Sequence, residues 1–267
     1  MNRVVICKGR DIVKRTEKAL SKLNPSLPAK NSKILIKPNL VEPYPKESGA
    51  VTRPEVVEGI IRYLDYIGKY KILVGEGSSY TERTRECFEK AGYFYLEDKY
   101  DVEVVPFDEN DFVLIKLDGE KWKEIKISKI VKDSDYIISV PALKEHFYVV
   151  TLALKNMMGV IEPKGYYPNK SYMHSSFSRG TWSKRLSDLL TKVKPHLSVI
   201  DGTTGMFGSH LNGELKQMNI TIAGEDPVAT DSVAAKILGN DKVFYIDDAE
   251  KRGIGSKKAE VERISID

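Results

Sequence analysis

Short runs of β-branched and aliphatic residues alternate along this 267-residue chain with longer segments in which apolar residues recur at helical spacing. Such alternation is typical of βα units, in which helices join parallel strands and pack on the sheet. We therefore expect an α/β fold: a mainly parallel, Rossmann-like layered sheet with helices on both faces. Strands are predicted at residues 4–7, 34–37, 72–76, 102–106, 136–140, 197–201, 220–223 and 243–245.

Three helices are predicted from their apolar spacing or their ends. Residues 11–23 and 54–66 place apolar side chains about every 3.6 positions, which indicates helices with one face on the sheet. The third helix, at residues 227–238, has Asp226 as its N-cap, Pro227 at its first position and Gly239 just past its end.

No fixed-period repeat, low-complexity tract or flexible linker divides the sequence, so we expect one α/β domain over residues 1–267. Residues 112–117 and 122–127 flank Asp118-Gly119-Glu120, which predicts a β-hairpin inserted at residues 108–128. Residues 159–181 are rich in Gly and Tyr and form a long predicted loop. Long loops in compact domains often act as lids or binding loops.

The charge pattern argues against a nucleic-acid-binding protein. The 42 Lys and Arg residues are interspersed with 38 Asp and Glu residues. Nucleic-acid binders instead concentrate cations on one stripe. The longest apolar runs fall far short of the roughly 20 residues that a membrane span needs, and no signal peptide follows Met1. We therefore expect a cytoplasmic protein that has no membrane partner.

Two further features of composition bear on cofactors and source. Cys7 and Cys87 are too few and too far apart to hold an iron–sulfur cluster or a cysteine-based zinc site within one chain. Gln217 is the single glutamine, while Lys, Glu, Ile and Tyr are abundant. This bias is typical of proteins from hot environments, so a thermophilic source is expected.

The main candidate site follows the predicted strand at residues 136–140. Lys144, His146, Lys155 and Asn156 come after this strand, and ligands of open α/β sheets bind where strands end. Lys144 and His146 are two residues apart, so an extended chain points them to the same side. A nearby lysine would keep His146 neutral and able to act as a base. The alternatives are a hydrogen-bonding structural role for His146 and a solvated or carboxylate-paired Lys155.

Other strand exits carry further candidate groups. Lys37 and Asn39 leave the strand at residues 34–37, and Arg53 stands at the start of the helix at residues 54–66, where a phosphate or carboxylate could bind. Glu76, between two glycines, could act as a base or ligate a metal. The alternatives are a solvated lysine, an ordinary helix cap and a plain βα turn.

Residues 202–208 are glycine-rich and follow a predicted strand. We expect a loop here in which Gly202 and Gly205 expose backbone N–H groups to an oxyanion. His146, His174 and His210 show no close histidine pair, so no metal site is predicted. Asp231 lies near a helix N-terminus, where an acid favours the dipole.

Several of these motifs, in this order, resemble the family called domain of unknown function 362, over roughly residues 30–240. They are Ile36-Lys37-Pro38-Asn39-Leu40, Gly75-Glu76-Gly77, Lys144-x-His146, Ala153-Leu154-Lys155-Asn156-x-x-Gly159, Asp201-Gly202 and Asp226-Pro227-Val228-Ala229-x-Asp231. Many members of that family carry a ferredoxin-like cysteine module, which this chain lacks, so the resemblance implies a stand-alone form without its own cluster. A fainter similarity links Thr52-Arg53-Pro54, the helix after it and residues 75–84 to the nickel-pincer lactate racemase family. That similarity implies that Arg53 binds a small carboxylate.

Together these observations give two hypotheses. In the first, a crevice lined by lysine and histidine binds a small anionic metabolite, a carboxylate or a phosphate, and the protein acts on it as an enzyme. Its lysines hold the anion; His146 is the favoured acid–base group, with Lys144 and Glu76 as further catalytic candidates. The second is a non-catalytic ligand-binding or accessory protein that docks on an iron–sulfur redox partner. The sequence does not identify a cofactor.

Overall fold

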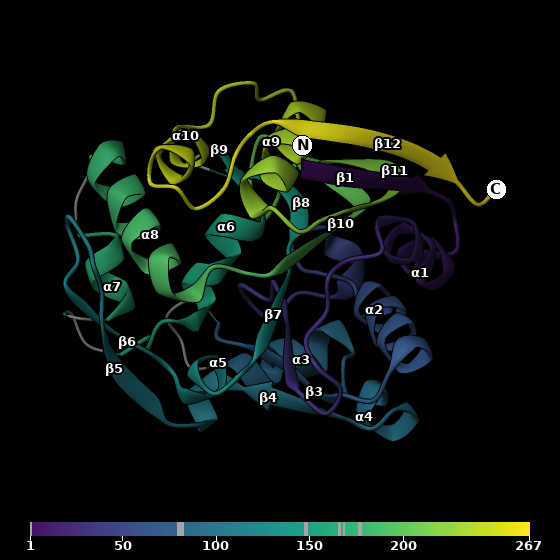
Figure 1. The fold of residues 1–267 in the computed structure, drawn as a ribbon, viewed down its shortest axis with the longest axis horizontal. Coiled ribbons are helices and arrows are strands. Elements are labelled where there is room, and N and C mark those ends of the chain that lie inside the picture. Colours follow the sequence, from purple (N-terminus) through teal and green to yellow (C-terminus); the bar gives the residue numbers. More distant parts are fainter. Residues whose placement is uncertain (1, 79–82, 147–148, 165–166, 168, 176–177) are drawn as a thin grey trace.

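The computed structural model describes residues 2–78, 83–146, 149–164, 167, 169–175 and 178–267 (Figure 1). Its strands are β1 (Asn2–Lys8), β2 (Lys33–Pro38), β3 (Lys71–Glu76), β4 (Val102–Pro106), β5 (Phe112–Lys116), β6 (Glu124–Ser128), β7 (Tyr136–Val140), β8 (Ala142–His146), β9 (Val149–Thr151), β10 (Leu197–Phe207), β11 (Glu214–Gly224) and β12 (Ala259–Ser265).

The α-helices are α1 (Ile12–Leu23), α2 (Pro54–Ile67), α3 (Thr84–Ala91), α4 (Tyr95–Lys99), α5 (Lys129–Lys132), α6 (Ala153–Asn156), α7 (Lys170–Met173), α8 (Arg179–Val193), α9 (Pro227–Ile237) and α10 (Phe244–Lys251). Three short 3₁₀ helices are η1 (Lys46–Ser48), η2 (Phe107–Glu109) and η3 (Met157–Val160). In the part of the chain that the structure describes, no helix is long and apolar enough to cross a membrane.

One sheet organises the molecule, in the strand order β12-β1-β11-β10-β7-β2-β3-β4. Each strand from β10 to β4 in this order runs parallel to its neighbour, while β11 runs antiparallel to both β1 and β10. The strand β8, which follows β7 along the chain, pairs with the C-terminal half of β10 and with β9. The predicted fold class is therefore confirmed: the chain is an α/β protein with a mostly parallel sheet.

Helices cover both faces of this sheet (Figure 1). Ile34 and Ile36 of β2 point into one core, which includes buried side chains of α1, α2 and α3. Leu35, between them, points into the other core, where α6, α8, α9 and α10 pack. Because strand residues alternate in direction, one continuous apolar run serves two cores.

The polar N-cap predicted for the helix at residues 227–238 is confirmed, and the helix predicted at residues 11–23 has a polar cap that was not predicted. Asp11 accepts from the backbone N–H of Lys14 at 3.0 Å and starts α1. Asp226 accepts from the N–H groups of Val228 and Ala229 at 2.9 and 3.0 Å and starts α9. The predicted helix at residues 54–66 is α2, with Pro54 in its first turn.

The strand predicted at residues 243–245 is wrong. Val243 is the N-cap of α10, and Tyr245, Ile246 and Ala249 are its buried residues. Three apolar residues are too few to distinguish the start of an amphipathic helix from a strand. The edge strand β12 was not predicted, because its side chains alternate between half-buried and exposed rather than forming an apolar run.

The predicted loop at residues 202–208 is also wrong, because most of it is strand. β10 continues to Phe207, with Gly202 opposite Ile220 and Gly205 opposite Lys216 on β11. A Cβ atom on Gly202 would lie 2.5 Å from the Ile220 side chain. This glycine therefore permits close packing of two strands rather than a turn, and it does not form an oxyanion nest.

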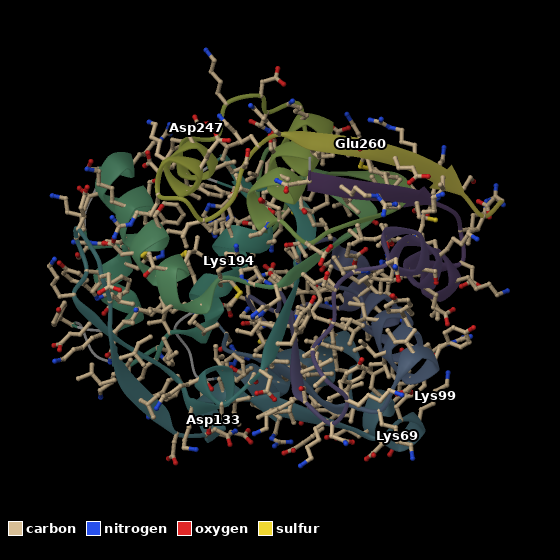
Figure 2. All side chains as sticks on the ribbon, viewed as in Figure 1. Lys69, Lys99, Asp133, Lys194, Asp247 and Glu260 are labelled. Carbon is tan, nitrogen blue, oxygen red and sulfur yellow. The ribbon has the colours of Figure 1, made fainter. Side chains whose placement is uncertain are left out.

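The predicted hairpin is present as β5 and β6, with Val113 opposite Ile127. A bridge from Ile127 to Ile161 joins it to the segment after η3. That segment, predicted as a long loop, contains α7 and the start of α8 in its described part. Charged side chains of both signs are spread over the outside of the molecule, as Lys69, Asp133 and Glu260 illustrate (Figure 2).

Candidate functional site

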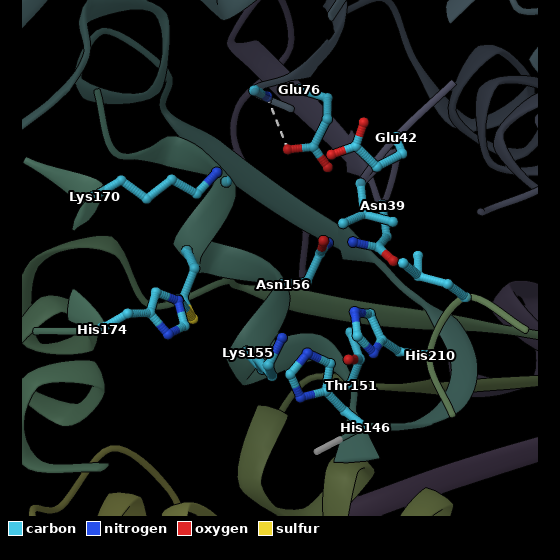
Figure 3. A pocket seen from close by; sticks show the side chains of 15 residues that line it. Asn39, Glu42, Glu76, His146, Thr151, Lys155, Asn156, Lys170, His174 and His210 are labelled. Atoms are coloured by element: carbon cyan, nitrogen blue, oxygen red, sulfur yellow. Dashed lines mark hydrogen bonds between the residues drawn. The ribbon is translucent and has the colours of Figure 1, made fainter. Parts of the chain in front are cut away.

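A cavity of about 370 Å³ opens where β2, β3 and β8 end. Figure 3 shows its polar side chains facing a common space. They come from strand ends, from α6 and from the segment that carries α7. These polar residues are Asn39, Glu42, Glu76, His146, Thr151, Lys155, Asn156, Lys170, His174 and His210.

A buried ion pair forms one wall of this cavity. Lys37 Nζ lies 2.7 Å from Glu76 Oε1 and 2.8 Å from Glu76 Oε2. The Glu76 carboxylate also accepts from the backbone N–H groups of Leu40, at 3.2 Å, and Gly77, at 2.8 Å. Burial lowers the pKa of Lys37, and the Glu76 charge opposes this effect. Both carboxylate oxygens are thus already bonded, which does not favour the predicted role of Glu76 as a base or metal ligand.

Asn156 ties α6 to the sheet beside this pair. Its Oδ1 accepts from Lys37 Nζ, and its Nδ2 donates to the Lys37 carbonyl and to Ser139 Oγ, each at 3.1 Å. These bonds occupy both N–H groups and one of the two lone pairs of the side-chain amide. Asn156 therefore positions the wall of the cavity.

The N-terminus of α6 is held by Asp231 of α9. Its Oδ1 accepts from the N–H of Ala153 at 2.8 Å, and its Oδ2 accepts from the N–H of Leu154 at 2.9 Å. Burial raises the pKa of Asp231 to about 8, although these two bonds oppose the rise. The sequence analysis placed Asp231 at the dipole of its own helix. In the structure its carboxylate caps the helix that carries Lys155.

Among the described residues, Lys155 and Lys170 line the cavity, and Lys144 lies close enough to Lys155 for their charges to interact. Lys170 Nζ donates to the Ser78 carbonyl at 2.7 Å, and Lys144 Nζ donates to the Ala50 carbonyl. Lys155 has no hydrogen-bond or ion-pair partner among the described residues.

Burial and like charge lower the pKa of all three amines. The pKa falls to about 7 for Lys144, where Lys155 adds to the effect of burial. It falls to about 7 for Lys155, with Lys170 and Lys37 as the neighbouring charges. For Lys170 the pKa is about 8, because Glu76 partly offsets burial.

Three imidazoles complete the polar lining. The rings of His146 and His210 lie 4.1 Å apart between centroids. Burial, reinforced by Lys155, lowers the pKa of His146, and the pKa of His174 and of His210 falls to about 4. All three rings are therefore neutral at pH 7. Sequence analysis expected a neutral His146 because of a nearby lysine, but burial is the larger cause.

These histidines do not form a metal cluster in the described part of the chain, where no three His, Cys, Asp or Glu side chains are placed to hold one ion. Two buried oxygen atoms at the cavity instead have no partner there, Asn39 Oδ1 and Thr151 Oγ1. Since buried polar atoms are usually hydrogen-bonded, these two are available to donors of a ligand or to water.

Five residues named from the sequence do not line the cavity: Lys37, Lys144, Arg53, Gly202 and Gly205. The backbone N–H of Arg53 donates to Asp201 Oδ2 at 2.9 Å, and this bond fixes the start of α2. Lys144 is buried, and its charge helps to lower the pKa of His146 and of His210.

Sequence reasoning missed Lys170, Glu42 and Thr151 as lining residues. Lys170 lies on a single helical turn within residues 159–181, and the length of that segment was the only available signal.

A family model described as domain of unknown function (DUF362) matches residues 34–236, more than half of the chain. The chain belongs to the DUF362 family. It is 26% identical over 212 residues to the thylakoid-associated protein sll1697 of Synechocystis sp., a match that covers 77% of this chain and 63% of that protein. The chain thus spans less than two thirds of the length of this relative.

Among solved structures, the fold is similar to that of the lactate racemase apoprotein from Thermoanaerobacterium thermosaccharolyticum. The TM-score is 0.50 at 14% sequence identity, and the match covers 87% of this DUF362 chain and 56% of the other. At this level of identity the similarity concerns the fold.

Proposed function

We propose that this DUF362 protein binds a small anionic metabolite, a carboxylate or a phosphate, in the cavity between Lys155 and Lys170, and that it is an enzyme acting on that anion. The proposal rests on one observation: at this cavity, lysine side chains outnumber the carboxylates that could balance their charges. Lys155 and Lys170 line the cavity, with Lys37 and Lys144 close to it. Glu76 is already paired with Lys37.

The depressed pKa values of the lysines support the same conclusion. Burial and mutual repulsion lower the pKa of Lys155 to about 7 and of Lys170 to about 8. An anion between them would offset the repulsion and favour their charged forms. Binding would therefore draw protons onto the lysines, and affinity would be greatest on the acidic side of their pKa values.

His146 is the proposed acid–base group. It lines the cavity, and the charge of Lys155 is the strongest of those acting on it. Burial and the lysine charges make its unliganded imidazole a weak base, and a bound anion would offset those charges and raise its pKa, so that it could accept a proton from the substrate. The two lysines could stabilise negative charge that develops on the substrate oxygen. Thr151 Oγ1 and Asn39 Oδ1 would orient the polar end of the substrate.

Calorimetry tests the binding step. Inorganic phosphate and acetate are titrated at pH 6.5 into the native chain, Lys155→Met, and the control Lys251→Met, whose side chain is 78% exposed on α10. We expect Lys155→Met to weaken binding at least about tenfold, or 1.4 kcal/mol, and the control to bind normally. Binding that is absent, or unchanged in Lys155→Met, contradicts the proposal.

Deuterium exchange tests the catalytic step. Small 2-hydroxy and 2-oxo acids are incubated with the protein in D₂O, and proton NMR follows loss of the C2–H signal of the hydroxy acids and of the C3–H signal of the oxo acids. Exchange that persists over many turnovers and disappears in His146→Asn supports an enzyme. Binding without exchange or product favours the non-catalytic alternative, a ligand-binding or accessory protein.

A further inference from the structure

We propose that Lys155 is a nucleophilic amine that forms an imine with the carbonyl carbon of a small aldehyde or ketone bearing a carboxylate or phosphate. This inference rests on the anion-binding function proposed above and narrows its substrate class. The geometry points to Lys155 because its amine faces the cavity without a partner among the described residues (Figure 3).

The other lysines near the cavity are each held by an oxygen atom. Lys37 Nζ is bound by the Glu76 carboxylate and by Asn156 Oδ1. Lys144 Nζ donates to the Ala50 carbonyl, and Lys170 Nζ donates to the Ser78 carbonyl. A nucleophilic amine needs a free lone pair and access to the substrate. Within the described part of the chain, Lys155 alone among these four meets both conditions.

The groups that face Lys155 favour its neutral form. Lys170 and Lys37 repel its positive charge, Lys144 adds a third cation nearby, and His146 and His174 are neutral. Of the carboxylates that line the cavity in the described part of the chain, Glu76 is paired with Lys37, and Glu42 lies on the segment after β2.

In the unliganded cavity, where its pKa is about 7, roughly half of the Lys155 amine is unprotonated at neutral pH. An ordinary lysine, with a pKa near 10.4, has on the order of a thousandfold less of the reactive form.

The backbone that carries Lys155 is held from both sides. Asp231 binds the N–H groups of Ala153 and Leu154, and the neighbouring Asn156 bonds to the strands beneath. Lys155 therefore projects from a fixed helical turn. A fixed attachment point favours one direction of attack on a bound carbonyl group.

The reaction balances without an outside oxidant or reductant. The Lys155 lone pair forms a C–N bond to the carbonyl carbon as the C=O π electrons move to oxygen. His146 takes a proton from the nitrogen and returns it to the carbinol oxygen. The proton that the Lys155 ammonium released when its lone pair was freed then returns through His146 to the carbinol oxygen, so that the C–O bond breaks, water leaves and a protonated imine remains. Overall, a lysine ammonium and a carbonyl compound yield an iminium ion and water.

Reductive trapping tests this assignment. The native chain is incubated at pH 7 with cyanoborohydride and one of three probes: glyoxylate, glycolaldehyde phosphate, or uncharged glycolaldehyde. Hydride adds to an imine carbon and leaves a stable secondary amine, whose added mass equals that of the probe less one oxygen atom. Peptide mapping locates the modified lysine. We expect Lys155 to react at least tenfold faster than the exposed Lys251, with the anionic probes only. The two anionic probes distinguish a carboxylate substrate from a phosphate.

Two controls keep the result interpretable. Lys155→Arg retains the charge but removes the nucleophile, so it should lose the fast label. Because a variant could fold poorly, inorganic phosphate is also added to the native chain, where it should protect Lys155 from both anionic probes.

Label spread evenly over exposed lysines, or equal labelling by uncharged glycolaldehyde, overturns the imine proposal. If phosphate still binds by calorimetry in that case, the anion-binding function stands and only the role of Lys155 as a nucleophile falls.

Discussion

Lys37 Nζ lies 2.7 Å from Glu76 Oε1, and both side chains are almost fully removed from solvent. The pair joins the ends of the parallel strands β2 and β3, where a ligand of an open α/β sheet is expected. It also consumes a carboxylate that could otherwise neutralise Lys155 or Lys170. The pair thus links two strands at the wall of the cavity, and its two charges cancel each other without cancelling those of Lys155 and Lys170.

Removing one partner of this pair should destabilise the protein strongly. Glu76→Gln leaves Lys37 buried without a counter-charge, so the free energy of unfolding should fall by about 3–5 kcal/mol in urea titrations. The double variant Lys37→Met/Glu76→Leu removes both charges and should recover much of the loss. A Glu76→Gln protein as stable as the native chain would show that the pair is not required.

Gly159 should tolerate no side chain, because it lies against the same pair. A Cβ atom there would collide with Glu76 Oε1 and lie 2.7 Å from Lys37 Nζ. We expect Gly159→Ala to lower the free energy of unfolding by about 2 kcal/mol. The matched control is Gly180→Ala in α8, where the nearest atom would be 3.8 Å away. It should be neutral or slightly stabilising, and equal effects of the two substitutions would contradict this reasoning.

Asp231 should make stability fall as pH rises through the neutral range. The folded state holds its proton up to about pH 8, whereas the ordinary pKa is 3.8. Between these values the folded state binds more protons, so its stability decreases with pH. The stability of the native chain relative to Asp231→Asn should fall by up to about 1.4 kcal/mol per pH unit. A difference that stays constant from pH 4 to 8 would disprove this assignment.

The cavity histidines should resist protonation until the solution is distinctly acidic. The pKa of His174 and of His210 is about 4, because of burial and the nearby lysines. NMR of the imidazole nitrogens should show neutral rings from pH 8 to 5.5. Phosphate in the cavity should raise both pKa values, because it offsets the lysine charges. Titration of His210 near the ordinary value of about 6.5 without ligand would contradict the described burial.

Much of the sheet could be predicted because its strands are short apolar runs with clear boundaries. The central strand Tyr136–Val140 is buried along its whole length, as a strand covered on both faces should be. The same reasoning failed at Val243, where a short apolar run begins a helix. It also failed at Gly202, where glycine serves strand packing rather than a turn.

The candidate site could be predicted only in part, because its contacts connect distant segments. Lys37, Glu76 and Lys155 were identifiable because each follows or ends a strand near its exit. The capping of Ala153 by Asp231, 78 residues away, depends on how α9 packs against α6. Similarly, no spacing rule places His210 against His146, since the contact requires β10 and β8 to pair.

The most direct test of the central claim is to locate a bound anion. Crystals grown without sulfate or phosphate are soaked in dilute selenate, and anomalous diffraction at the selenium edge gives its position. The account predicts a selenium peak in the cavity, within hydrogen-bond distance of Lys155 Nζ and Lys170 Nζ, that disappears in Lys155→Met crystals. A cavity without selenium, or an equal peak in the variant, would contradict it.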